Sequence, residues 1–194
     1  GIHDNRALQR FADAALGKAP TATGTPIIIT EAGRVVVGAF IEASVIALSL
    51  ITLVLIVVLR RPVDVLLVLV PLALAILFTA ATSVFLDLQL NFANVIVLPL
   101  LLGLGVSGAI HVVIRRRALR AEEALPGPVS TPRAVLFSAL TTIASFGSLA
   151  ISPHPGMASM GLLLTVAILW SLICTLVILP ALFALVDPFR STPP

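Results

Sequence analysis

A predominantly apolar run from Asn94 to Ile114 ends at three consecutive arginines, residues 115–117. A helix over this run measures roughly 30 Å at 1.5 Å per residue, about the thickness of a bilayer's hydrocarbon core. Glycines and Ser107 lie in the middle of the run, and His111 lies near its end. Because small and polar groups inside a membrane normally face protein or water, we expect this helix to lie within a bundle.

The composition also indicates an integral membrane protein. The chain is 59% hydrophobic and 11% charged, whereas a soluble domain has about 25% charged residues. The net charge of +3 does not indicate a nucleic-acid partner, because eight of the twelve basic residues lie in short segments beside apolar runs, at Arg60 and Arg61, in 115–133 and at Arg190. The sequence contains no metal-ligand cluster, phosphate-binding loop or carboxylate pair, so we expect no metal, no cofactor and no enzymatic activity.

Apolar runs predict an all-α membrane protein with five transmembrane helices, preceded by a short α/β tail of a periplasmic, porter-like domain. The tail covers residues 1–34, the bundle 35–187 and a cytoplasmic tail 188–194. The predicted spans are 35–59, 63–81, 94–114, 134–151 and 157–186.

The predicted periplasmic tail has three parts. Apolar residues at helical spacing predict a helix over 5–16, and residues 20–24 form a turn-rich break. The β-branched residues of 27–30 predict a short strand, and Thr30 is a candidate N-cap for the helix that follows. A segment this small cannot hold a core alone, so we expect it to be the end of a larger exported domain.

The arginines predict the orientation of the bundle. With the arginine-bearing segments on the cytoplasmic side, five spans place the N-terminus in the periplasm and the C-terminus in the cytoplasm. The two loops on the other side, 87–92 and 152–156, contain no Lys or Arg. The prediction is consistent at every loop.

Several motifs resemble the MMPL-type halves of the RND transporter superfamily. Gly103-Leu-Gly-Val-Ser-Gly-Ala-Ile-His111 is similar to the Gly-x-Gly-Val-Asp-Tyr-x-Ile-His pattern of the fourth helix of such a half. The segments 139–150, 153–156, 160–161 and 179–182 match as well, and Leu90 to Gly103 is most similar to the hopanoid-associated branch. The resemblance implies a bacterial inner-membrane protein that exports a lipid, with hopanoids expected, through its periplasmic domains. We expect a homo-oligomer that also contacts membrane lipids.

One departure from the family pattern bears on the mechanism. Ser107 stands where the pattern has its proton-carrying aspartate, Gly108 replaces the aromatic residue, and no Asp or Glu occurs in 94–114. A serine carries no charge at physiological pH, so the resemblance implies that the titrating carboxylate comes from the N-terminal half of the same transporter. Ser107, Thr141 and Thr142 are candidate hydrogen-bonding partners for it at the bundle centre.

Gly105-Val-Ser-Gly108 also matches the nucleophile motif of rhomboid proteases. That chemistry needs a histidine from a later helix within hydrogen-bond reach of the serine. His111 lies on the same helix and His154 in an external turn, so we do not expect a protease. Gly103, Gly105 and Gly108 instead indicate close helix packing.

Other polar residues have two readings each. His111 either shuttles protons or is an interfacial, hydrogen-bonded histidine. Glu42 either lines a lipid entrance or is an interfacial carboxylate held by solvent. Asn91 and Asn94 are helix caps or substrate ligands, and the two threonines either take part in the relay or bond back to carbonyls four residues earlier.

The function has alternatives too. A sterol-sensing-like domain that binds lipid without pumping, or a drug exporter of the same superfamily, fits the same helices. Export of heavy metals is disfavoured because no Met or His cluster lines the spans.

Overall fold

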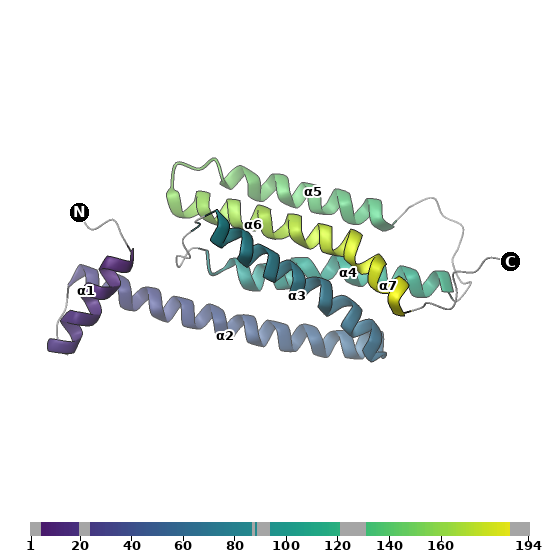
Figure 1. Ribbon diagram of the computed structural model, residues 1–194, viewed down its shortest axis with the longest axis horizontal. Helices are drawn as coiled ribbons and strands as arrows, with labels where there is room; N and C mark the ends of the chain where they lie inside the picture. Colours follow the sequence, from purple (N-terminus) through teal and green to yellow (C-terminus); the bar gives the residue numbers. More distant parts are fainter. Residues whose placement is uncertain (1–4, 20–23, 87, 89–93, 121–130, 187–194) are drawn as a thin grey trace.

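The computed structural model describes residues 5–19, 24–86, 88, 94–120 and 131–186, and these residues are helical apart from short connections (Figure 1). The elements in chain order are α1 (Asn5–Lys18), α2 (Thr25–Leu59), α3 (Pro62–Phe85), α4 (Val97–Arg120), α5 (Thr131–Leu149), α6 (Pro155–Ile173), the π-helical turn η1 (Cys174–Ile178) and α7 (Leu179–Val186). The last three follow one another without a break. Most of the predicted turn at 20–24 lies outside the described residues.

The N-terminal segment corrects part of the prediction. The helix expected over 5–16 is present as α1, but the strand predicted at 27–30 is wrong, because these residues form the beginning of α2. A proline in the first turn fits a helix start, and β-branched residues lower helix propensity only slightly. Thr30 therefore lies inside α2 and is not its N-cap, which is Gly24.

Helix α2 is continuous through residue 34, where the sequence suggested a boundary. With 35 residues it measures roughly 52 Å at 1.5 Å per residue, well beyond the thickness of a hydrocarbon core. Its first turns therefore extend past the apolar span, and α1 packs against this extension (Figure 1). Arg34 on α2 pairs with Asp13 on α1 and lies 3.7 Å from Glu31.

Four stretches of helix within the described part of the chain are long and apolar enough to cross a membrane: Ile27–Leu59, Pro62–Phe85, Val97–Ala118 and Pro155–Val186. They correspond to the first, second, third and fifth predicted spans. The fourth prediction coincides with α5, which is helical but is not among the four. Arg133 and repeated serines and threonines make α5 more polar than the others, so its crossing of the membrane stays a prediction.

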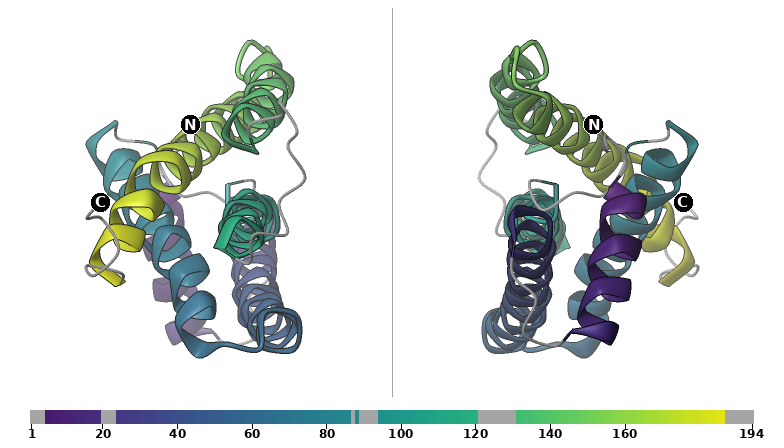
Figure 2. Two further views of the ribbon diagram at one scale, coloured as in Figure 1. Left: turned by 90° about the vertical axis from the view of Figure 1, so that its right-hand side faces the viewer. Right: turned by 90° about the vertical axis from the view of Figure 1, so that its left-hand side faces the viewer.

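The core of the bundle lies between α3, α4 and α6, and α2 joins it at one end. Leu55 and Leu59 of α2 pack there with Val68 of α3 and Val106 of α4, while the rest of α2 is largely exposed. On α6, Trp170 donates a hydrogen bond from Nε1 to Thr82 Oγ1 at 2.9 Å and stacks on Phe78. Helix α5 lies beside α6 at the edge of the bundle (Figure 2).

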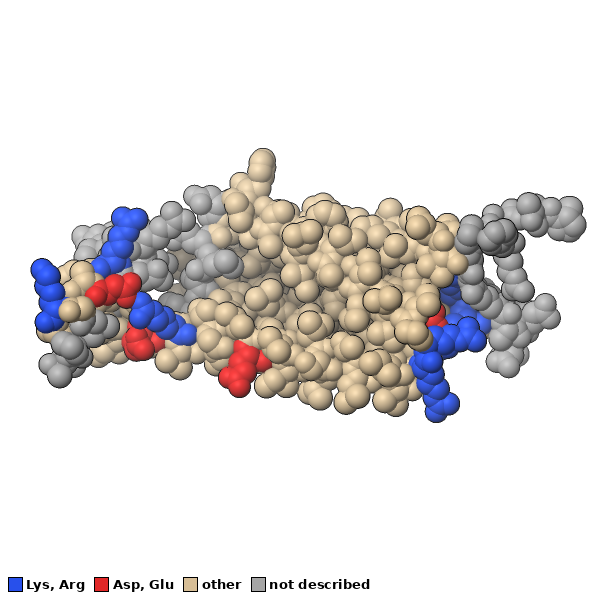
Figure 3. All heavy atoms as spheres, turned by 60° about the horizontal axis from the view of Figure 1, so that its bottom comes forward, with Lys and Arg blue, Asp and Glu red and all other residues tan. Residues whose placement is uncertain are grey.

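Charged side chains gather at the two ends of the molecule (Figure 3). We call the end that contains Arg60, Arg61 and residues 115–117 the arginine end. Arg117 Nε lies 3.0 Å from Asp64 Oδ2, which ties α4 to the first turn of α3. Arg116 donates to the Phe183 carbonyl at 3.1 Å and lies 3.8 Å from the centre of the Phe183 ring, which ties α4 to α7.

Candidate functional site

A cleft of about 440 Å³ separates α4 and α5 and has α6 and η1 as its floor. We call it the α4–α5–α6 cleft. It exists because α5 packs mainly on α6, has few contacts with α4 and has no buried residue. Its polar lining consists of Ser107, His111, Thr131, Ser138, Thr142, Ser171 and Thr175.

Helical periodicity explains why these polar residues share one space. On α5, Thr131, Ser138 and Thr142 are seven and four residues apart, which places them on one face of the helix. Ser171 and Thr175 are four residues apart and form the polar part of the floor. Small residues on α5, such as Ala134 and Ala139, also line the cleft and leave the space open.

Ser107 lines this cleft from α4, with His111 one turn further toward the arginine end. The Ser107 hydroxyl is exposed and lies 3.4 Å from the carbonyl oxygen of Leu104, a long contact for a hydroxyl donor. It is therefore available to a stronger partner that enters the cleft. His111 is also exposed.

The two threonines singled out in the sequence differ in their surroundings. Both Thr141 and Thr142 donate from Oγ1 to the carbonyl of Ser138, each at 2.8 Å. Only Thr142 lines the cleft. A hydroxyl that donates to its own helix still has an acceptor lone pair, so the Thr142 hydroxyl can accept a hydrogen bond from a donor in the cleft.

The three glycines of α4 also differ. A Cβ on Gly105 would lie 2.9 Å from Leu72 Cδ1 and 3.0 Å from Ser171 Oγ, and one on Gly108 would lie 3.2 Å from Val135 Cγ1. At these two positions, side chains of α3, α5 and α6 lie close to the backbone of α4. A Cβ on Gly103 would have no neighbour within 4 Å.

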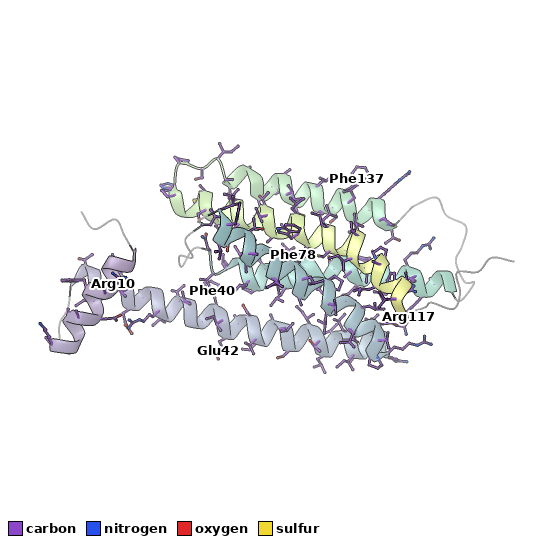
Figure 4. The ribbon with its side chains drawn as sticks, viewed as in Figure 1. Arg10, Phe40, Glu42, Phe78, Arg117 and Phe137 are labelled. Atoms are coloured by element: carbon purple, nitrogen blue, oxygen red, sulfur yellow. The ribbon has the colours of Figure 1, made fainter. Side chains whose placement is uncertain are left out.

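The predicted entrance residues lie away from the cleft. Glu42 is exposed on α2 and points away from the bundle (Figure 4). Asn94, 1% exposed, is hydrogen-bonded to Ser159 at the start of α6, with Asn94 Nδ2 donating to Ser159 Oγ at 2.6 Å. Its backbone carbonyl accepts from the Val97 amide, so it also participates in the first turn before α4. Asn91 lies outside the described residues.

Sequence reasoning missed Ser138, Ser171 and Thr175 as members of this site. The usable signal for Ser138 was its position four residues before Thr142, on the same face of a polar helix. Ser171 and Thr175 carried no comparable signal in the sequence. What the sequence does not reveal is that α5 lies apart from α4, and this separation creates the cleft.

The chemistry of the cleft is that of an uncharged, hydrogen-bonding site. No Asp, Glu, Lys or Arg is among its lining residues in the described part of the chain. Within the same residues no group of His, Cys, Asp or Glu could hold a metal ion. The hydroxyls can both donate and accept hydrogen bonds, which suits water, a hydroxylated molecule or a carboxyl group from another part of the protein.

Comparisons with known proteins place this arrangement in context. The profile of the MMPL family matches residues 3–194. The chain is 46% identical over 180 residues to the hopanoid transporter HpnN of Rhodopseudomonas palustris and 42% identical to the hopanoid transporter HpnN of Burkholderia multivorans. Each match covers 93% of this chain but 20% of the transporter, so the chain spans about a fifth of the length of these relatives. A membrane protein of Methanocaldococcus jannaschii is 28% identical over 84% of this chain and 44% of its own length.

Proposed function

The chain belongs to the MMPL family, and we propose that it forms the C-terminal membrane portion of a proton-driven RND-type exporter that moves hopanoids from the inner toward the outer membrane. The observation that carries this proposal is the identity of 46% and 42% to two hopanoid transporters over nearly the whole of this chain. The four long apolar helices among the described residues agree with a membrane transporter.

We place the arginine end in the cytoplasm and α1 in the periplasm of a bacterial inner-membrane protein. The positive-inside rule supports this orientation, because Arg60 and Arg61 directly precede α3 and the Arg117–Asp64 ion pair brings residues 115–117 to the first turn of the same helix. The extension of α2 that carries α1 then protrudes on the periplasmic side, where a larger domain of the complete protein would receive the lipid. Glu42 faces away from the bundle, where it would meet lipid or another part of the transporter.

The proton-coupling step needs a carboxylate, and the cleft has none among its described lining residues. We propose that the N-terminal half of the complete transporter supplies it and that it approaches the exposed Ser107 hydroxyl. Ser107 and Thr142 then accept or donate hydrogen bonds according to the protonation state of the carboxyl group, and His111 lies on the same face toward the cytoplasm. Such an arrangement uses hydroxyls to stabilise both states of the carboxyl group without adding a charge inside the membrane.

The lipids that co-purify with the complete protein in mild detergent test the substrate. Mass spectrometry should find a pentacyclic triterpenoid enriched over bulk phospholipid. Phospholipid at bulk proportions alone would contradict the hopanoid assignment.

Proton uptake into vesicles that contain the complete protein tests the coupling. An exporter takes up protons when hopanoid is supplied, and the uptake is lost when the acidic residue of the matching helix in the first half is replaced by its amide. A sterol-sensing-like domain would bind lipid and show no uptake.

A further inference from the structure

The π-helical turn η1 and the proline that follows it leave the backbone carbonyl of Thr175 without a helical amide donor. The amide of Leu179 donates to the carbonyl of Cys174, five residues earlier, and not to the carbonyl of Thr175, four residues earlier. The next residue, Pro180, has no amide hydrogen. The carbonyl of Thr175 therefore receives neither the i+4 donor of an α-helix nor the i+5 donor of a π-helix.

An unpaired carbonyl at this place is unfavourable. Thr175 is 3% exposed and lies in a helix apolar enough to cross a membrane. Away from water a backbone carbonyl without a partner costs free energy comparable to a lost hydrogen bond. Prolines persist in membrane helices where a hydroxyl side chain or an ordered water satisfies the freed group.

The surroundings of Thr175 are polar and have room for such a partner. The side chains of Thr175 and Ser171 both line the α4–α5–α6 cleft, and neither hydroxyl is hydrogen-bonded to another described residue. Glycines on α4 allow this close approach, because a Cβ on Gly105 would lie 3.0 Å from Ser171 Oγ and one on Gly108 would lie 3.7 Å from Thr175 Cγ2. A water molecule takes up about 30 Å³ of liquid volume, a small part of the cleft's roughly 440 Å³.

The chemistry of the lining decides between water and a cation. A sodium or other metal ion would bring a full charge into a cleft that has no carboxylate among its described lining residues, and an uncompensated charge is far costlier to bury than an uncharged polar molecule. A buried water needs two to four polar partners. The Thr175 carbonyl and the Thr175 hydroxyl supply two. The Ser171 hydroxyl lies one turn earlier on a side chain that leans toward the start of the helix, whereas the carbonyl points toward its end, so it is too far away to bind the same water.

We infer that Thr175 holds an ordered water molecule in the α4–α5–α6 cleft, bound to its own hydroxyl and to the carbonyl that the π-turn and Pro180 leave free. This water satisfies the backbone and allows the π-turn to persist inside the membrane. The inference does not depend on proton coupling, because it follows from the backbone hydrogen bonds of η1 and from a cleft that has no carboxylate among its described lining residues.

Electron cryo-microscopy of the complete protein in lipid nanodiscs, at a resolution that shows waters, tests this site. The wild-type map should contain density about 2.7–3.2 Å from the Thr175 carbonyl oxygen. In Pro180→Ala the new amide supplies a donor, so the π-turn should revert to α-helix and the density should disappear. In Thr175→Val, which keeps the size of the side chain and removes its hydroxyl, the density should weaken or disappear.

The matched control is Val177→Thr, which makes the reverse exchange in the same turn at a side chain that is 63% exposed; it should leave the density unchanged. If Pro180→Ala does not fold, the comparison of Thr175→Val with Val177→Thr still tests the site, because neither substitution adds or removes a backbone amide hydrogen. A wild-type map without density, or with the carbonyl bonded to a protein side chain, would overturn the inference. Density that has five or six oxygen neighbours and vanishes when sodium is replaced by choline would identify a cation and would also overturn it.

Discussion

Asn94 and Ser159 form a reciprocal pair of hydrogen bonds between the start of α4 and the start of α6. Asn94 Nδ2 donates to Ser159 Oγ at 2.6 Å, and Ser159 Oγ donates to Asn94 Oδ1 at 2.9 Å. Asn94 is 1% exposed, so the pair fixes the two helices at the end opposite the arginines. This contact gives Asn94, a polar residue at the start of a largely apolar run, a structural role that does not require it to bind substrate.

Asn94→Ala should lower the stability of the bundle by about 1–3 kcal/mol, because it leaves the part-buried Ser159 hydroxyl without this partner. Thermal unfolding in detergent measures the effect. The double variant Asn94→Ala with Ser159→Ala should cost less than the sum of the two single variants, since both remove the same pair. Strictly additive losses would show that the two side chains do not interact.

The ion pairs at the two ends should differ in their contribution to stability. Asp64 and Arg117 are largely shielded from water, with side-chain exposures of 16% and 33%, whereas Arg34 and Asp13 are more than half exposed. An exposed pair contributes about 0–1 kcal/mol, and a shielded charge that loses its partner costs more. Asp64→Asn should therefore lower the unfolding temperature more than Asp13→Asn does.

Salt separates the two cases further. Raising the salt concentration should reduce the small effect of Asp13→Asn, because exposed charges are screened, and should change the effect of Asp64→Asn less. Equal losses with equal salt dependence would mean that the Asp64–Arg117 pair is as solvated as the other one.

Much of the bundle was predictable because long apolar runs bounded by arginines leave few alternatives. The helix limits at Leu59 and Pro62 follow from the chain turning at Arg60, which adopts a left-handed conformation, and from Pro62 in the first turn of α3. The error at 27–30 came from local preference, since three β-branched isoleucines favour a strand only when nothing else decides. In the structure these residues form the first turns of the continuous helix α2.

The candidate site was predictable only in part. Ser107 and Thr142 were recognised by a motif, and the structure brings them to one cleft. Thr141 has the same residue type and the same hydrogen bond but does not line the cleft. Ser171 and Thr175 belong to a different helix and carry no motif, so only the packing of α5 against α6 reveals them.

Alanine substitutions at three glycines should produce a graded loss of stability. At Gly161 a Cβ would lie 2.6 Å from Leu149 Cβ and 2.7 Å from the Ala150 amide nitrogen, so the backbone itself would have to move. At Gly105 the nearest atom is the end of the flexible Leu72 side chain. We expect a large loss for Gly161→Ala and about 1–3 kcal/mol for Gly105→Ala.

Gly103→Ala is the matched control for that series, because nothing lies within 4 Å of its added Cβ. Alanine has a higher helix propensity than glycine by about 1 kcal/mol, so this variant should be neutral or slightly more stable in thermal unfolding. A loss at Gly103 as large as that at Gly105 would show that another part of the complete protein packs against this side of α4.

Substitutions of hydroxyls in the complete transporter separate a role in the cleft from a role in the helix. Thr142→Val and Thr141→Val remove the same hydrogen bond to the Ser138 carbonyl, so their effects on stability should be similar. Only Thr142 lines the cleft. If its hydroxyl stabilises the coupling step by about 1 kcal/mol, Thr142→Val should slow proton uptake about fivefold, and Thr141→Val should leave it close to wild type.

Ser107→Ala should slow proton uptake at least as much as Thr142→Val, because the Ser107 hydroxyl has only a long contact of 3.4 Å within its own helix and is free to serve the cleft. Its effect on thermal unfolding should be small for the same reason, so a lower rate with an unchanged unfolding temperature is the expected combination. Equal rates for Thr141→Val and Thr142→Val, with Ser107→Ala at the wild-type rate, would remove the cleft from the coupling pathway and leave its hydroxyls a structural role.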